Sequence, residues 1–211
     1  MPPIQTFYSL SAKAVIQSLE IRNMRGFYCE TAEEALAKAL SFAALGSTVA
    51  WGESQTLEDI GLKQALKSRS YNIIDRDAAI AEEDRMALDR LALSCDCFFT
   101  GANAITLDGK LVNMDCNGNR AAALIFGPKN VIVITGMNKV MPDEEAAVAR
   151  VRKQAAPHDN MRLKRDTPCA TTGLCFDCLE DECLCSNLVI TRRSCAKNRI
   201  KVILIGEDLG Y

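Results

Sequence analysis

Cysteine residues near the end of the chain form its densest group of possible metal ligands. Six of the 10 cysteines lie between residues 169 and 195. Thiolates at short spacings, here including a Cys-x-x-Cys pair, can enclose one zinc ion or one iron–sulfur cluster of the 4Fe–4S type. The predicted ligands are Cys169, Cys175, Cys178 and either Cys183 or Cys185. Spacing alone does not separate the two metals, and free thiols or a redox-active pair are the alternative.

A second group of polar residues lies in the stretch GANAITLDGKLVNMDCNGNR, residues 101–120. Its first half predicts a β-hairpin with a tight turn at Asp108-Gly109, and its second half predicts a polar loop that enters a short helix over residues 121–126. An arginine fork in this loop would bind a carboxylate or phosphate, and an internal ion pair between Arg120 and Asp115 is the alternative. The candidate ligand-binding residues here are Asn113, Asp115, Gly118, Asn119 and Arg120.

Three further residues could contact an anion. Ser54 and Thr56 lie at a predicted helix start, where they either bind an anion or cap the helix. Lys139 follows a predicted buried strand and is either a ligand contact or a solvated charge. The single histidine, His158, is expected to be exposed, and Cys116 is expected to be a small packed residue rather than a nucleophile. The sequence contains no nucleotide-binding or hydrolase motif.

Composition narrows the class of partner. The 211 residues include 25 basic and 27 acidic side chains, and a net charge of −2 gives no electrostatic reason to expect nucleic-acid binding. There is no apolar run long enough for a membrane helix, and the start MPPIQTFYSLSAK lacks the order of a signal peptide. We therefore expect a cytoplasmic protein whose cysteines are thiols rather than disulfides.

Strands and helices alternate along the predicted chain. Strands are expected at residues 27–30, 48–51, 71–74, 97–100, 105–114 (the hairpin), 130–135, 188–191 and 200–205, and helices at 5–24, 31–45, 57–69, 79–94, 121–126 and 143–155. This alternation predicts an α/β fold with an open, mainly parallel, Rossmann-like sheet and helices on both faces. We expect a single domain over 1–211, with 166–187 as a cysteine-rich insertion. Ligands of such sheets bind at the carboxyl ends of strands, here the loops WGESQT, TGANA, MDCNGNR and TGMNK.

These segments, together with NIIDRD, TPCATTGLCFDC and KVILIGEDLGY, resemble the LUD-domain (lactate utilisation) family in its short stand-alone form. The resemblance implies a fold similar to phosphosugar isomerases, CoA transferases and formyltetrahydrofolate cyclo-ligases. The family pattern PCxxTGxCxDC falls on residues 168–178, and its later cysteine, just before a strand, implies Cys185 as the fourth ligand rather than Cys183. Glu53 departs from the small residue usual in the family and adds a negative charge beside the candidate anion site.

The resemblance also implies a function. Family members accompany iron–sulfur subunits in the oxidation of L-lactate to pyruvate, so we expect an iron–sulfur-associated subunit or accessory factor of lactate or organic-acid utilisation. A small organic acid or other small anion would be its ligand, other lactate-oxidation subunits would be its partners, and a homo-oligomer is a possible assembly. The alternatives are a zinc-stapled ligand-binding or regulatory module without turnover and, on fold analogy alone, an acyl or CoA transferase.

Overall fold

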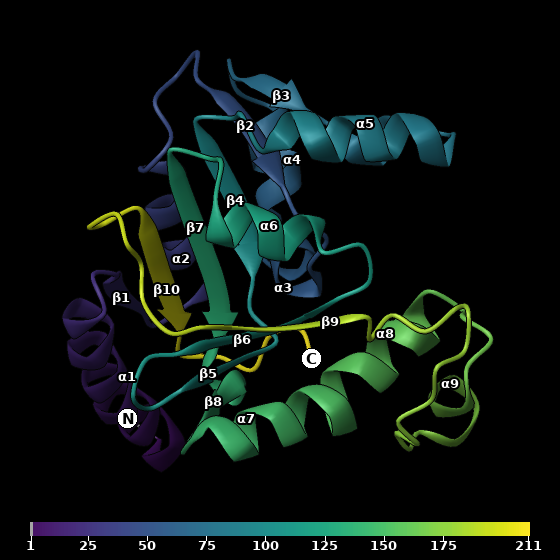
Figure 1. The fold of residues 1–211 in the computed structure, drawn as a ribbon. Helices are drawn as coiled ribbons and strands as arrows, with labels where there is room; N and C mark the ends of the chain where they lie inside the picture. Colours follow the sequence, from purple (N-terminus) through teal and green to yellow (C-terminus); the bar gives the residue numbers. More distant parts are fainter. Residues whose placement is uncertain (1) are drawn as a thin grey trace.

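Six parallel strands form the main sheet of the computed structural model, which describes residues 2–211 (Figure 1). Their order across the sheet is β1-β10-β7-β4-β2-β3. The strands are β1 (Arg25–Cys29), β2 (Thr48–Trp51), β3 (Asn72–Ile74), β4 (Cys97–Gly101), β7 (Asn130–Gly136) and β10 (Ile200–Ile205). The interior strand β7 is a β-branched run that is buried almost throughout, as a parallel sheet covered on both faces requires. The predicted α/β class with a mainly parallel sheet is confirmed.

Helices cover both faces of this sheet because its strands present apolar side chains in both directions. Val131 and Val133 of β7 pack on one face, whereas Ile132 and Ile134 pack on the other. The first face is covered by α1 (Pro3–Ile21), α5 (Glu82–Ala92) and α6 (Asn119–Ile125), and the second by α2 (Ala32–Leu40), α3 (Gln55–Asp59) and α4 (Leu62–Lys67). Among residues 2–211, no helix combines the length and the apolar character needed to cross a membrane.

The helix expected over residues 57–69 is two helices in the structure. Gly61 stands between α3 and α4 with φ of +68°, a left-handed conformation that glycine adopts without a Cβ clash. Both halves still bury leucines against the sheet, because Leu57 lies on α3 and Leu62 and Leu66 lie on α4. The apolar pattern therefore gave the correct buried face, and the interruption at Gly61 was missed.

The helix expected over 143–155 extends further than predicted. It starts as α7 (Glu144–Arg150), where Asp143 caps the first turn, passes through a π-helical turn (η3, Val151–Ala155) and continues as α8 (Ala156–Arg162). Pro157 lacks a backbone N–H and would break a regular α-helical ladder at this point. The wider turn before it lets the helix continue, and π turns of this kind are common beside functional sites.

A second, four-stranded sheet, with the order β8-β5-β6-β9, was not predicted. It contains β5 (Ala104–Thr106), β6 (Leu111–Asp115), β8 (Val140–Met141) and β9 (Asn187–Thr191). The expected hairpin is present as the antiparallel pair β5–β6, with Ile105 opposite Leu111. β9 then pairs antiparallel with β6. This pairing brings the end of the cysteine segment to the polar loop that follows β6.

Candidate functional site

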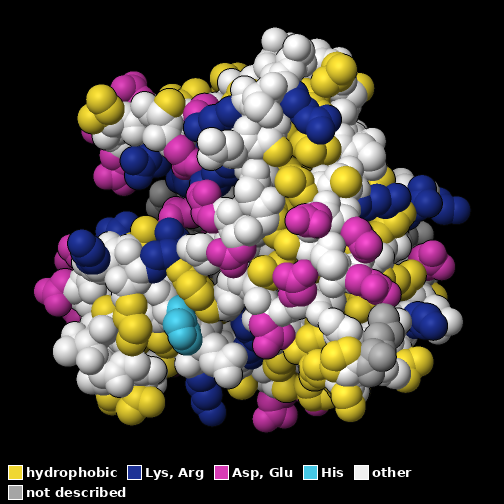
Figure 2. Space-filling model, turned by 180° about the vertical axis from the view of Figure 1, so that it is seen from behind, with side chains coloured by type: hydrophobic (Ala, Val, Ile, Leu, Met, Phe, Trp, Pro, Cys, Tyr) yellow, Lys and Arg dark blue, Asp and Glu magenta, His cyan; other side chains and the backbone are white. Residues whose placement is uncertain are grey.

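A cleft of about 770 Å³ lies at the carboxyl edge of the main sheet. The four loops that the sequence placed there all line it, and they follow β2, β4, β6 and β7. Residues of α5 form one side of the cleft and residues of α8 form another. Figure 2 shows this hollow between two lobes, with basic and acidic side chains on both sides. This position is the usual ligand site of an open α/β sheet.

Lys139 is the most perturbed cation of the cleft. It ends the short helical turn η2 (Met137–Lys139) directly after β7 and is only 3% exposed, although it lines the cleft. Nζ donates a hydrogen bond to Thr56 Oγ1 over 2.8 Å, and no carboxylate within residues 2–211 forms an ion pair with it. Burial, reinforced by the nearby Arg150, lowers the pKa of Lys139 to about 7. The solvated-charge alternative for Lys139 therefore does not hold.

Arg120 is occupied by contacts within the protein. Nη1 donates to Gly101 O and, over 2.6 Å, to Asn113 Oδ1. Nη2 donates to Asn103 Oδ1 and lies 2.6 Å from Asp115 Oδ1. The structure thus contains the internal ion pair that was the alternative to ligand binding. The guanidinium joins the loop after β4 to the loop after β6, and Arg120 is itself part of the cleft lining.

Of the other six predicted ligand residues, three line the cleft and three do not. Ser54, Asp115 and Asn119 line the cleft. Thr56 lies behind Lys139 as its hydrogen-bond acceptor. The remaining two, Asn113 and Gly118, are not in the cleft wall: the first is buried beneath Arg120, and the second precedes α6 as its N-terminal cap residue.

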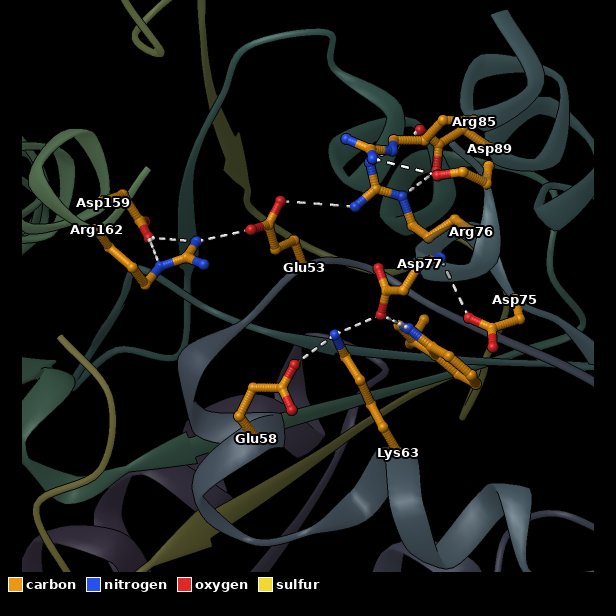
Figure 3. A network of polar contacts seen from close by, with 12 residues as sticks. Glu53, Glu58, Lys63, Asp75, Arg76, Asp77, Arg85, Asp89, Asp159 and Arg162 are labelled. Atoms are coloured by element: carbon orange, nitrogen blue, oxygen red, sulfur yellow. Dashed lines mark hydrogen bonds and ion pairs between the residues drawn. The ribbon is translucent and has the colours of Figure 1, made fainter. Parts of the chain in front are cut away.

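A chain of ion pairs crosses the mouth of the cleft (Figure 3). Glu53, after β2, pairs with Arg162 of α8 at 2.8 Å and faces Arg76 at 3.6 Å. Arg76 belongs to the turn η1 (Arg76–Ala78) and is held by Asp89 of α5 through two hydrogen bonds. Arg162 also pairs with Asp159 at 3.0 Å. These cations are therefore compensated, unlike Lys139.

Sequence reasoning missed several of these residues. Arg76 follows the carboxyl end of β3, so the rule that located the other loops would have found it. Arg162 was missed because the helix that carries it was expected to end near residue 155. Cys116, expected to be packed, is exposed at the cleft, where its thiol lies 3.9 Å from the carbonyl oxygen of Cys183. His158 is exposed as expected, and its ring stacks on Tyr211.

The clustered cysteines line a second, smaller cavity of about 230 Å³. All ten cysteines of the chain are free thiols. The cavity-lining thiols are Cys169, Cys175, Cys178, Cys183 and Cys185. They lie on α9 (Pro168–Thr172) and on the loop between α9 and β9, beside α8 at the far end from α7 (Figure 1). Cys195 lies outside this group and is exposed.

The donor set of this cavity suits a soft metal, because sulfur ligands select zinc and iron–sulfur clusters. Burial and the neighbouring thiols of Cys183, Cys175 and Cys169 raise the pKa of Cys185 to about 12. A bound cation would oppose both effects, because it stabilises the thiolate form of its ligands. As the side chains stand, no three His, Cys, Asp or Glu residues within 2–211 are close enough to hold a metal ion. A metal would therefore have to draw the thiols together.

The two cavities share a wall. Met114 of β6 and Ala156 of α8 line both of them. Cys116 lies in the cleft and contacts the cysteine segment through the carbonyl oxygen of Cys183. The polar cleft and the thiol cavity are thus adjacent and are separated by single side chains.

The fold and the cleft define a Rossmann-like α/β protein with a polar cleft at the carboxyl edge of its sheet. The chain belongs to the LUD-domain family, whose model matches residues 12–205, and this makes it a lactate-utilisation-associated protein. No curated protein matches the chain.

Two solved structures are similar in arrangement. A DUF162-family protein from Deinococcus radiodurans is 13% identical over 95% of this chain and 98% of its own, with a TM-score of 0.49. The delta subunit of eIF2B from Chaetomium thermophilum is 18% identical over 66% of this chain and 54% of its own, with a TM-score of 0.33.

Proposed function

We propose that this LUD-domain protein binds a small organic acid in the cleft, holds an iron–sulfur cluster in the thiol cavity, and serves the oxidation of lactate or a related 2-hydroxy acid. The observation that carries the proposal is the wall shared by the two cavities, formed by Met114 and Ala156. A ligand site and a redox site need this proximity to act together. A structural staple unrelated to the cleft would not need it.

The inner end of the cleft has the charge that an organic acid requires. Lys139 lines the cleft and Arg150 is buried near it, and neither forms an ion pair with a carboxylate in the part of the chain that the structure describes. A ligand carboxylate would supply the missing counter-charge and favour the protonated form of Lys139. Ser54, whose hydroxyl has no hydrogen-bond partner among residues 2–211, lines the same cleft and can hydrogen-bond the ligand.

Cys169, Cys175, Cys178 and Cys185 are the residues that would hold the metal, with Cys183 as the competing fourth ligand. An iron–sulfur cluster would supply one-electron chemistry, whereas zinc, which has no redox chemistry, would supply stability alone. The protein's own contribution is a cavity that keeps Cys169 buried and the other three thiols half-buried, with the buried residues Ala156 and Pro157 in its wall.

The two carboxylates that the transferase alternative named, Glu53 and Asp115, do not support it. It needs a carboxylate free to act as a nucleophile in the cleft. Glu53 is paired with Arg162, and Asp115 is paired with Arg120 while it also accepts a hydrogen bond from the backbone of Ala121. Both carboxylates therefore have structural partners.

Anaerobic purification followed by metal and sulfide analysis tests the proposal. We expect a coloured protein that contains iron and acid-labile sulfide and that binds L-lactate or pyruvate in calorimetry. Cys175→Ser should lose the iron, whereas the matched variant Cys195→Ser, outside the cavity, should retain it. A colourless protein with one equivalent of zinc would contradict the redox function and support the alternative, a zinc-stabilised binding module without turnover. Comparison of Cys183→Ser with Cys185→Ser identifies the fourth ligand, which we expect to be Cys185.

A further inference from the structure

The primary amine of Lys139 is buried and held in one position, which simple anion binding does not require. Nζ is held by Thr56 Oγ1 at 2.8 Å, and the backbone of Gly210 approaches it from the chain's last residues. That approach is so close that a Cβ at Gly210 would lie 2.9 Å from Nζ, so a side chain there would displace the amine. The amine is thus fixed in position and largely desolvated while it lines the cleft.

Charged groups from four helices surround this amine. Arg150 of α7 and Arg120 of α6 disfavour a proton on Nζ, whereas Asp159 of α8 and Asp59 of α3 favour one. Burial is the strongest influence and, with Arg150, brings the pKa of Lys139 to about 7. A substantial fraction of the amine is therefore neutral near neutral pH. Desolvation and an adjacent cation are the conditions that make a lysine nucleophilic toward carbonyl compounds.

We propose that Lys139 forms a reversible imine with the carbonyl carbon of a small 2-oxo acid in the cleft. The inference rests on the proposed function, because oxidation of a 2-hydroxy acid yields a 2-oxo acid. Nζ bonds to the carbonyl carbon, and the carbonyl oxygen leaves as water with the two hydrogens of the amine. The step consumes no oxidant or reductant. The cleft then distinguishes product from substrate, since a 2-hydroxy acid has no carbonyl carbon at that position to attack.

Lys63 provides an internal comparison at the same edge of the sheet. Burial alone would lower its pKa, but hydrogen bonds to Asp77 and Glu58 outweigh this effect and raise it. Its amine lies 2.7 Å from Asp77 and 2.6 Å from Glu58 (Figure 3). Lys63 is therefore charged near neutral pH and should not react, although its side chain is also largely covered.

The test uses the wild-type protein, pyruvate and sodium cyanoborohydride, which reduces an imine to a stable amine. Peptide mapping by mass spectrometry should place the reduced adduct on Lys139 and leave Lys63 unmodified, and L-lactate should give no adduct. The yield should rise as the pH increases through about 7, because the neutral amine is the reactive form. Equal labelling of many lysines would overturn the inference.

Two variants separate the imine from simple binding. Lys139→Arg keeps a cation but removes the nucleophilic amine, so it should abolish the adduct; Lys63→Arg is the matched control and should retain it. If pyruvate binds in calorimetry and no adduct forms on Lys139, the inference fails while the proposed function stands. If neither pyruvate nor L-lactate binds, the proposed function fails as well. Mapping of the wild-type protein decides the question even where a variant does not fold.

Discussion

Lys139 is a buried lysine whose pKa lies far below the ordinary value for this side chain. A lysine buried without a carboxylate partner is a cost to folding, because the unfolded chain keeps that amine protonated up to its ordinary pKa near 10.5. The folded protein holds the pKa at about 7, so between these two values the unfolded chain binds more protons. The stability of the wild-type protein should therefore rise with pH across this window.

Replacement of Lys139 with methionine should reveal this cost. We expect Lys139→Met to raise the free energy of unfolding by on the order of 2 kcal/mol near pH 6, where the penalty is fully present. The gain should shrink as the pH rises toward about 10. Urea denaturation of both proteins at several pH values measures the difference, and Lys139→Arg, which stays charged, is the control that should show no gain. A gain that does not change with pH would contradict the assigned pKa.

We expect substitution of Arg120 to lower stability, in contrast to Lys139→Met. The reason is that the Arg120 guanidinium already has hydrogen-bond and ion-pair partners within the protein. Arg120→Lys removes the planar fork that reaches Asn113, Asn103 and Asp115 at once. We expect a loss of about 2–4 kcal/mol in the free energy of unfolding, since Asp115 would remain buried with an incomplete partner. Arg165→Lys, at the exposed rim of the same cleft, should change stability by less than about 0.5 kcal/mol. Equal stability of the two variants would return Arg120 to the role of a ligand contact.

At the scale of elements, the cleft depends on how α8 is attached to the main sheet. The ion pair of Glu53 with Arg162 joins the loop after β2 to α8 across the cleft mouth. Both side chains are partly exposed, so the pair should contribute little to stability. Its larger effect is electrostatic, because Glu53 places a negative charge at the mouth through which the proposed organic acid would enter.

Neutralisation of Glu53 should separate these two effects. We expect Glu53→Gln to change the free energy of unfolding by less than about 1 kcal/mol and to strengthen the binding of L-lactate or pyruvate several-fold, more at low salt than at high salt. Glu145→Gln, an exposed change on α7 outside the cleft, is the control. Unchanged affinity in Glu53→Gln, measured by calorimetry at two salt concentrations, would place the ligand away from this mouth.

The elements also show how far the sequence could predict this fold. The continuous apolar run of β7 and the glycine turn of the hairpin are local signals, and both elements formed. The turn, however, spans three residues, Leu107–Gly109, instead of the expected two, because Ile105 pairs with Leu111 and Thr106 N–H donates to Lys110 O. The pairing of β9 with β6 could not be predicted, because nothing in residues 187–191 identifies a partner so distant along the chain. The convergence of the loops could be predicted from the rule for parallel sheets. The pairing of Arg120 with Asp115 and Asn113 could not, because it depends on side-chain geometry.

At the scale of the whole molecule, the fold places two different cavities back to back. β6 and α8 each contribute one residue to both, Met114 and Ala156. The antiparallel β6–β9 pairing sets this arrangement, since β9 begins just after the last cavity thiol, Cys185. A ligand in the cleft and a metal in the thiol cavity would consequently affect one another.

The visible spectrum of the anaerobically purified protein, recorded with and without a saturating organic acid, tests this coupling most directly. The account predicts a sulfur-to-iron absorption that shifts or bleaches when L-lactate or pyruvate binds, with a much smaller change in Lys139→Met, which should bind the acid weakly. A spectrum that does not respond to an acid shown by calorimetry to be bound, or a protein that contains no iron, would contradict the claim that the cleft and the thiol cavity form one functional site.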